Sequence, residues 1–255
     1  MDTTLLKGLA VLEVLAARET PAGVSEIAGL LGIGKSNTHR LLQTLVAAGY
    51  VRRDADRRYA CSLRLWEKGW DVARRYDVAR VARAPMVALA QDTAETVNLS
   101  VLDGDEVVYL DKIDSPLPVR ADTRIAGRAP AYCTATGKAL LAHVEDPAAL
   151  LARVTWERFT ARTPRDAATV LSELSEVRRR GYALSRGEWR DGVAGVAAPI
   201  LGAGGRSLAA VGVGGPAERM PPARLRRLAP MVVAAAAAIT RAAGMGGPTL
   251  ARSAP

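Results

Sequence analysis

The sequence predicts an α+β fold in which a small helical unit with a β-hairpin precedes a larger unit of antiparallel sheet and packed helices. Three observations lead to this prediction. Apolar residues recur at helical period between residues 5 and 49, and an alternating run around Asp54-Ala55-Asp56 indicates a hairpin. From residue 85 onward, strand and helix patterns interleave without a regular βαβ rhythm, which favours an antiparallel sheet. The 255 residues are enough for two domains of ordinary size.

Two short amphipathic helices open the chain. The first is predicted over residues 5–17, ended by Thr20-Pro21-Ala22-Gly23. Its expected buried side consists of Leu5, Leu9, Leu12 and, in the last turn, Leu15 or Ala16. The second covers Val24–Leu31, and the tight turn Gly32-Ile33-Gly34 follows it. Together with the next helix, this order is typical of a helix-turn-helix.

The third helix carries the most informative surface of the sequence. Ser36 is expected as its N-cap, and Gly49 stands at the C′ position. Its apolar stripe consists of Leu41, Leu42, Leu45 and Val46. The opposite face has no carboxylate and consists of Ser36, Asn37, Arg40, Gln43 and Thr44. Such a face suits the major groove of DNA, where Arg reads guanine and Asn or Gln reads adenine.

The predicted hairpin follows this helix directly. Tyr50–Cys61 alternates around its tip, which four arginines flank: Arg52, Arg53, Arg57 and Arg58. This pattern indicates a wing that lies on DNA phosphates. A formal net charge of +9 also favours a polyanionic partner. The alternative is a plain three-helix packing unit with a solvated charged loop.

Composition limits the other possibilities. The two cysteines, Cys61 and Cys133, and the two histidines, His39 and His143, are scattered, so we expect no metal site and no disulfide framework. Inert thiols are favoured over redox sensors. No uninterrupted apolar run approaches about 18 residues, and the N-terminus has no secretion signal. We therefore expect a cytoplasmic protein without membrane contact or cofactor.

Leu5–Tyr59 resembles the winged helix of the IclR-type bacterial transcriptional regulators, and Ser36–Leu42 is close to that family's recognition helix. The resemblance continues to about Ala243. It implies a winged helix-turn-helix DNA-binding domain at 1–62, a linker helix at 63–84 and a GAF-like effector-binding domain at 85–243; residues 244–255 are expected to be a disordered tail. It also implies a double-stranded, palindromic operator as partner and a homodimer or homotetramer.

The predicted linker helix runs over Leu63–Arg83 and is ended by Ala84-Pro85. Trp66, Trp70 and Tyr76 lie near one stripe of it, either as core or as a self-association face; the family dimerises in this region. Further helices are predicted over 85–94, 136–144, 166–180 and 221–243. Strands are predicted over 96–102, 106–113, 119–122, 182–185, 193–201 and 207–214.

The residues expected to bind DNA are Lys35, Ser36, Asn37, Thr38, Arg40, Gln43, Thr44, Arg52, Arg53, Arg57 and Arg58. Base edges would be met by the polar face of the third helix, and phosphates by Lys35 and the hairpin arginines. His39 lies in the same helix and either contacts phosphate or faces solvent.

Two glycine-rich stretches fail as nucleotide sites. Tyr132 stands where a phosphate-binding loop needs its first glycine. Pro216 prevents the helix that must follow the glycines of a dinucleotide-binding fingerprint. No catalytic constellation is present, so we do not expect an enzyme. The resemblance instead implies that these stretches bind a small carboxylate effector. The matching residues are Tyr132, Ala135, Thr136, Gly137, Ser185, Trp189, Val193, Gly195, Gly212 and Gly214.

The chain departs from relatives at several of these positions, and three of the departures are glycines. Many relatives have Cys at Gly195 and often Ser at Gly212 and Gly214, so each glycine is expected to add room. The hypothesis is a bulkier ligand, such as an aromatic carboxylate, with its anionic end on the backbone around Ala135–Gly137. Ser185 would add a hydrogen bond, and Trp189 and Tyr132 would be walls. The alternative is that the glycines serve tight strand packing and the pocket is vestigial.

Overall fold

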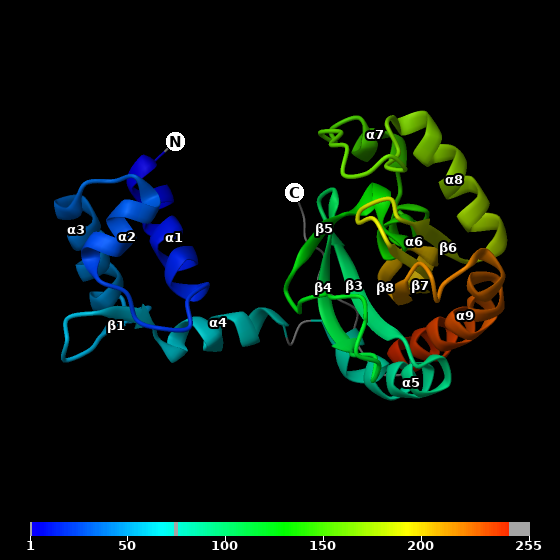
Figure 1. The fold of residues 1–255 in the computed structure, drawn as a ribbon, viewed down its shortest axis with the longest axis horizontal. Helices are drawn as coiled ribbons and strands as arrows, with labels where there is room; N and C mark the ends of the chain where they lie inside the picture. Colours follow the sequence, from blue (N-terminus) through cyan, green and yellow to red (C-terminus); the bar gives the residue numbers. More distant parts are fainter. Residues whose placement is uncertain (1, 74–75, 245–255) are drawn as a thin grey trace. The chain divides into compact units, whose positions relative to one another are not determined.

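In the computed structural model, which describes residues 2–73 and 76–244, the chain divides into two compact units, Met1–Tyr76 and Asp77–Pro255 (Figure 1). Apart from Gly244, the predicted C-terminal tail lies outside the described residues. No helix of the described ranges is long and apolar enough to cross a membrane.

The N-terminal unit has the predicted order of three helices, a hairpin and a fourth helix. Its elements are α1 (Thr3–Ala16), α2 (Val24–Leu31), α3 (Lys35–Ala47), β1 (Val51–Arg53), β2 (Tyr59–Cys61) and α4 (Leu63–Ala73). The core of this unit includes Val11, Leu15, Ile27, Leu42 and Tyr59. Tyr59 lies on β2 and is 1% exposed, so the hairpin is anchored in the helical core.

The predicted buried face of α1 is wrong in its first turns. Leu5 and Leu9 are 63% and 47% exposed, whereas Val11 and Leu15 are buried. Among the described residues, only the C-terminal half of α1 contributes to the core of its unit. A helical period identifies a stripe, but it does not say how far along the helix that stripe is covered.

The termini of α3 differ from the prediction at one end. The N-cap is Gly34, not Ser36, which lies within the helix, and no side chain caps this end. At the other end Gly49 has φ +80°, its N–H donates to Val46 O, and the Tyr50 N–H donates to Leu45 O. This is the Schellman arrangement that the sequence predicts.

The linker prediction is also corrected. The described part of the linker helix, α4, ends at Ala73, and a separate helix, α5 (Val78–Thr93), runs through Pro85. Proline removes one helical N–H and crowds the carbonyl four residues earlier, so it normally ends a helix. Here one face of α5 is buried on both sides of Pro85, including Ala82, Met86 and Leu89. That burial maintains the helix across the proline.

The C-terminal unit is built on a six-stranded antiparallel sheet with the strand order β5-β4-β3-β8-β7-β6. Its strands are β3 (Thr96–Asp103), β4 (Glu106–Ile113), β5 (Arg128–Pro130), β6 (Ala183–Arg186), β7 (Val193–Leu201) and β8 (Ser207–Pro216). The helices are α5, α6 (Ala135–Leu141), α7 (Pro147–Leu151), α8 (Ala167–Arg180) and α9 (Pro222–Gly244). Figure 1 shows α5 and α9 on one face of this sheet and α6 with α8 on the other.

Most predicted elements of this unit are present, with one exception. The strand expected over 119–122 does not form, and the third strand of the first half is β5. The segment is held by side chains instead of a strand ladder. Thr96 Oγ1 donates to Ala121 O at 3.3 Å, and Thr123 Oγ1 donates to Asn98 Oδ1 at 2.7 Å. These contacts bring residues 121–123 beside β3.

Candidate functional site

The exposed face of α3 is polar and has no acidic residue. Its exposed members are Lys35, Ser36, His39, Arg40, Gln43 and Thr44. Arg40 Nη2 donates to Asn37 Oδ1 at 3.2 Å, and Thr44 Oγ1 donates to Arg40 O at 3.0 Å. The two side chains suited to reading base edges, Asn37 and Arg40, are therefore oriented by one another.

Thr38 does not belong to this face. Its side chain is fully buried, and its hydroxyl donates to Gly34 O at 3.1 Å, one turn earlier. The prediction that Thr38 contacts DNA is therefore wrong. The hydroxyl is thus turned back onto the backbone of its own helix and is not available to DNA.

The hairpin tip is closed by Asp54 and carries exposed cations. The Asp54 N–H donates to Arg58 O at 2.9 Å, and Asp54 Oδ1 accepts from the Arg58 N–H at 2.8 Å. Arg52, Arg53 and Arg57 are exposed. Three of the four predicted arginines are thus available to phosphates.

Arg58 has a structural task. Its Nε donates to Pro21 O at 2.9 Å, and its Nη2 pairs with Glu26 Oε2 at 2.8 Å. The same Glu26 oxygen accepts from the Gly23 N–H at 2.6 Å, and that hydrogen bond, with the charges of Arg58 and Arg18, lowers the pKa of Glu26. Arg58 therefore fixes the hairpin to the start of α2. Because its guanidinium is engaged in these contacts, the prediction that it binds DNA phosphate is corrected.

The hairpin is also tied to α3. Gln43 Nε2 donates to Tyr59 Oη at 3.3 Å, and the guanidinium of Arg53 lies 5.7 Å from the Tyr59 ring centroid. The polar helix face and the cationic hairpin therefore belong to one connected surface of the N-terminal unit.

The C-terminal unit contains a cavity of about 100 Å³ between the sheet and the start of α6. Eight of the ten residues predicted to bind an effector line it: Ala135, Thr136, Ser185, Trp189, Val193, Gly195, Gly212 and Gly214. Residues that sequence reasoning missed also line it, among them Asn98, Tyr109, Asp122, Thr123 and Arg190. Asn98 could have been found as the one amide of the predicted strand 96–102, but Arg190 gives no such signal.

Tyr132 and Gly137 do not line the cavity, so both predictions are corrected. Tyr132 is buried elsewhere: its hydroxyl donates to Glu157 O at 2.8 Å, and its ring packs on Trp156. Gly137 is required by close packing, because a Cβ there would lie 2.2 Å from Ala131 O. Its N–H donates to Thr134 Oγ1, so it is not free to bind an anion.

The three glycines that distinguish this chain are not equivalent. A Cβ at Gly195 would lie 2.9 Å from Val213 O, and one at Gly212 would lie 2.9 Å from Thr136 Cγ2. These two glycines serve tight packing, so the prediction that they add room is wrong. At Gly214 the nearest atoms to a Cβ would be 3.9 Å away. Only Gly214 leaves space that a side chain would otherwise fill.

The lining groups deep in the cavity are neutral. Ser185 Oγ donates to Cys133 O at 3.1 Å. Burial raises the pKa of Tyr109 to about 12, although the Arg190 charge and the Thr136 hydroxyl act in the opposite direction. Burial likewise raises the pKa of Cys133 to about 12, with Glu188 adding to the shift. Both groups are therefore protonated near neutral pH.

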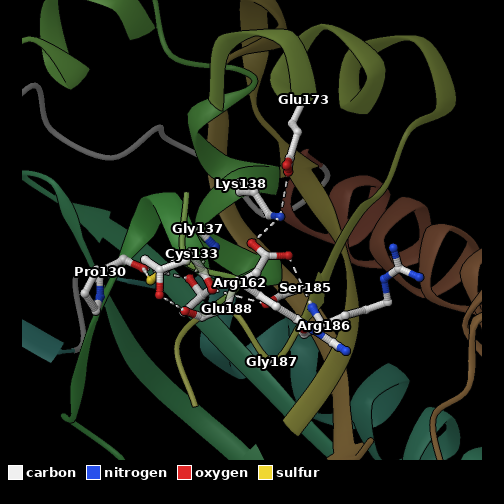
Figure 2. A network of polar contacts seen from close by, with 12 residues as sticks. Pro130, Cys133, Gly137, Lys138, Arg162, Glu173, Ser185, Arg186, Gly187 and Glu188 are labelled. Carbon is white, nitrogen blue, oxygen red and sulfur yellow. Dashed lines mark hydrogen bonds and ion pairs between the residues drawn. The ribbon is translucent and has the colours of Figure 1, made fainter. Parts of the chain in front are cut away.

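A buried ion network holds the loop that carries Trp189 and Arg190 (Figure 2). Lys138 on α6 is 1% exposed, and its Nζ lies 2.6 Å from Glu188 Oε2 and 2.7 Å from Glu173 Oε2 on α8. Glu188 O accepts from Thr163 Oγ1 at 2.6 Å. The loop between β6 and β7 is thus fixed to α6 and α8, which sets the outer wall of the cavity.

Comparison with known proteins covers both units. The sequence profile described as the IclR helix-turn-helix domain matches residues 4–55, and that of the bacterial transcriptional regulator IclR C-terminal domain matches residues 70–241. The chain is 32% identical over 241 residues to the HTH-type transcriptional regulator XynR of Escherichia coli, covering 93% of this chain and 96% of XynR.

Solved structures give the same result for the fold. The Thermotoga maritima IclR structure matches with a TM-score of 0.80 and 29% identity, over 96% of this chain and all of that chain. An IclR homolog from Microbacterium hydrocarbonoxydans, solved in complex with 4-hydroxybenzoate, matches with a TM-score of 0.79 and 25% identity. That match covers 94% of this chain and 100% of the other.

Proposed function

The chain belongs to the IclR family of bacterial transcriptional regulators, and from this premise we propose that it is a sequence-specific DNA-binding regulator controlled by a small organic acid. DNA binding is assigned to the N-terminal unit and effector binding to the cavity of the C-terminal unit. The protein acts in the cytoplasm, where DNA is accessible, and has no enzymatic activity of its own.

The observation that carries the DNA-binding proposal is the carboxylate-free exposed face of α3 beside the cationic hairpin. Arg40, Asn37 and Gln43 would meet base edges in the major groove. Lys35, Arg52, Arg53 and Arg57 would bind phosphates, which fix position but carry no sequence information. Because Gln43 and Arg53 both contact Tyr59, helix and hairpin would dock as one surface.

An organic acid is supported as effector by the cavity and by the related structure that contains 4-hydroxybenzoate. The volume of about 100 Å³ is of the order of the roughly 150 Å³ apolar cavity that binds benzene in an engineered protein. The comparison therefore limits the enclosed part of the ligand to about one small ring. The lining combines apolar walls with a few polar groups, as expected of a small-molecule site.

The regulator would act as a homo-oligomer on a palindromic operator. Trp66 and Trp70 on α4 support self-association, because they are 65% and 58% exposed and stack with ring centroids 6.0 Å apart. Effector binding would change operator affinity by a coupling free energy of roughly 1–3 kcal/mol, about 5- to 150-fold.

A thermal-shift screen of the full chain against aliphatic and aromatic carboxylates tests effector control. An effector that binds the folded state raises the melting temperature in a concentration-dependent manner. Each hit is then added to the protein–DNA complex, where the affinity for operator should change. A protein that binds operator but is stabilised by none of these acids would instead be an effector-independent DNA binder with a vestigial cavity.

A further inference from the structure

Asn98 on β3 is a buried polar side chain with one unused hydrogen-bonding group. It is 7% exposed and lines the cavity. Its Oδ1 accepts from Thr123 Oγ1 at 2.7 Å, which fixes the orientation of the amide. Among the described residues, Nδ2 has no protein partner, and it is not one of the fully enclosed polar atoms, so it is open to the cavity. An unmade buried hydrogen bond is costly, so this position favours a ligand acceptor.

Arg190 offers the complementary group at the outer end of the same cavity. Its guanidinium lies 4.3 Å from the Trp189 ring centroid, and its Nη1 donates to Asp122 O at 3.3 Å. None of the ion pairs within the described ranges includes Arg190, so its charge has no carboxylate partner there. Arg190 and Asp122 are the charged side chains of the lining, and both are exposed.

Apart from neutral hydroxyl groups such as those of Ser185 and Thr136, the rest of the lining is largely apolar. Ala121, Val196, Val213 and Trp189 contribute to the lining. A cation at the exposed end, an apolar middle and a neutral donor at the buried end define a ligand with one charge and one remote acceptor. A second negative charge on the ligand would face the Asp122 carboxylate or the neutral interior, and both are unfavourable.

We infer that the effector is a ring-shaped monocarboxylate with a second, uncharged hydrogen-bonding group. This inference rests on the proposed function of the cavity as an effector site. Arg190 pairs with the effector's carboxylate, and Asn98 Nδ2 donates to the second group, a hydroxyl or carbonyl oxygen. Arg190 is thereby assigned the role first expected of the α6 backbone, where one donor, the Gly137 N–H, is already bound by Thr134 Oγ1.

Isothermal titration calorimetry of the full chain with three ligands tests the assignment. Wild-type protein should bind 4-hydroxybenzoate about tenfold more tightly than benzoate, the difference expected of one additional hydrogen bond. It should also bind 4-hydroxybenzoate more tightly than the neutral 4-hydroxybenzamide. Asn98→Ala should remove the preference for 4-hydroxybenzoate over benzoate and retain the preference for 4-hydroxybenzoate over 4-hydroxybenzamide. Arg190→Gln should retain the preference over benzoate and remove the preference over 4-hydroxybenzamide.

Arg186→Gln is the matched control, because Arg186 is an exposed arginine on the neighbouring strand that does not line the cavity. It should leave both preferences unchanged. Equal wild-type affinity for benzoate and 4-hydroxybenzoate, or an Asn98→Ala protein that retains the preference, would overturn the assignment alone. A wild-type protein that binds no carboxylate would overturn the proposed effector control as well. If Asn98→Ala does not fold, the wild-type affinities for benzoate and 4-hydroxybenzoate and the ligand preferences of Arg190→Gln still test the assignment.

Discussion

Lys138 Nζ lies 2.6 Å from Glu188 Oε2 in the interior of the C-terminal unit, where the Lys138 side chain is 1% and the Glu188 side chain 14% exposed. Glu188 is followed by Trp189 and Arg190, the outer wall of the cavity. Burial raises the pKa of Glu188 and the Lys138 charge opposes that shift. The Lys138 charge therefore favours the ionised form of a carboxylate whose surroundings disfavour it.

Lys138→Met should lower the free energy of unfolding by about 3 kcal/mol or more, because it leaves the buried Glu188 carboxylate without a counter-ion. Glu173→Gln is the matched control: Glu173 is 43% exposed, so the change should cost less than about 1 kcal/mol. Urea denaturation of both variants measures the difference. Equal losses would mean that the buried pair has no special role.

The glycines of β8 provide a second matched pair. Gly212→Ala places a Cβ 2.9 Å from Thr136 Cγ2 and 3.0 Å from Ala197 Cβ, so it should destabilise the fold by about 1–3 kcal/mol. Gly214→Ala should have little effect on stability, because its Cβ would have ordinary contacts at 3.9 Å. Thermal denaturation distinguishes the two. A tolerated Gly212→Ala would indicate that the start of α6 yields easily.

Self-association should depend on the exposed tryptophans of α4. The double variant Trp66→Ser/Trp70→Ser should shift the sedimentation profile toward monomer without loss of helical content, since neither ring is buried in its own unit. Val119→Ser, which also removes an exposed apolar side chain, is the control and should not change the oligomer. Unchanged association of the double variant would exclude this face as the main contact.

His143 should make stability sensitive to mild acid. Burial, together with the charge of Arg178, lowers its pKa below the ordinary value of 6.5. As the pH falls below about 6.5, the unfolded chain binds a proton that the folded protein resists, so stability decreases. His143→Gln should reduce this loss between pH 7 and pH 5 in urea denaturation. A pH dependence identical to that of wild type would assign the effect to other groups.

Local patterns in the sequence predicted most of the elements and many of the residues that line the cavity. The Gly49 terminus of α3, the hairpins and most cavity residues follow from turn chemistry, strand alternation and family resemblance. The failures have tertiary causes. Pro85 remains in α5 because the helix face around it is buried, and Thr38 turns inward to bond Gly34. Arg58 is not available to DNA because it pairs with Glu26, which is 32 residues away in the chain.

The cavity also shows that local sequence patterns do not predict contacts made by tertiary folding. Family resemblance identified the strands that form it. Asn98 and Arg190, however, lie far apart in sequence, and they line the same cavity only because of how β3 and the β6–β7 loop fold. The sequence alone also does not distinguish the role of Gly212 from that of Gly214. Their different roles depend on Thr136 and Ala197, which approach Gly212 and not Gly214.

The most direct test of the account is a fluorescence-anisotropy titration of full-length protein with a duplex obtained by in vitro selection and with a scrambled duplex. Arg40→Ala should lose about 1–3 kcal/mol of preference for the selected sequence, because a base contact is removed. Arg57→Ala should weaken binding to both duplexes alike and reduce the salt dependence, because a phosphate contact is removed. Equal effects of the two variants on both duplexes would contradict the division of the N-terminal unit into a reading helix and a phosphate-binding hairpin.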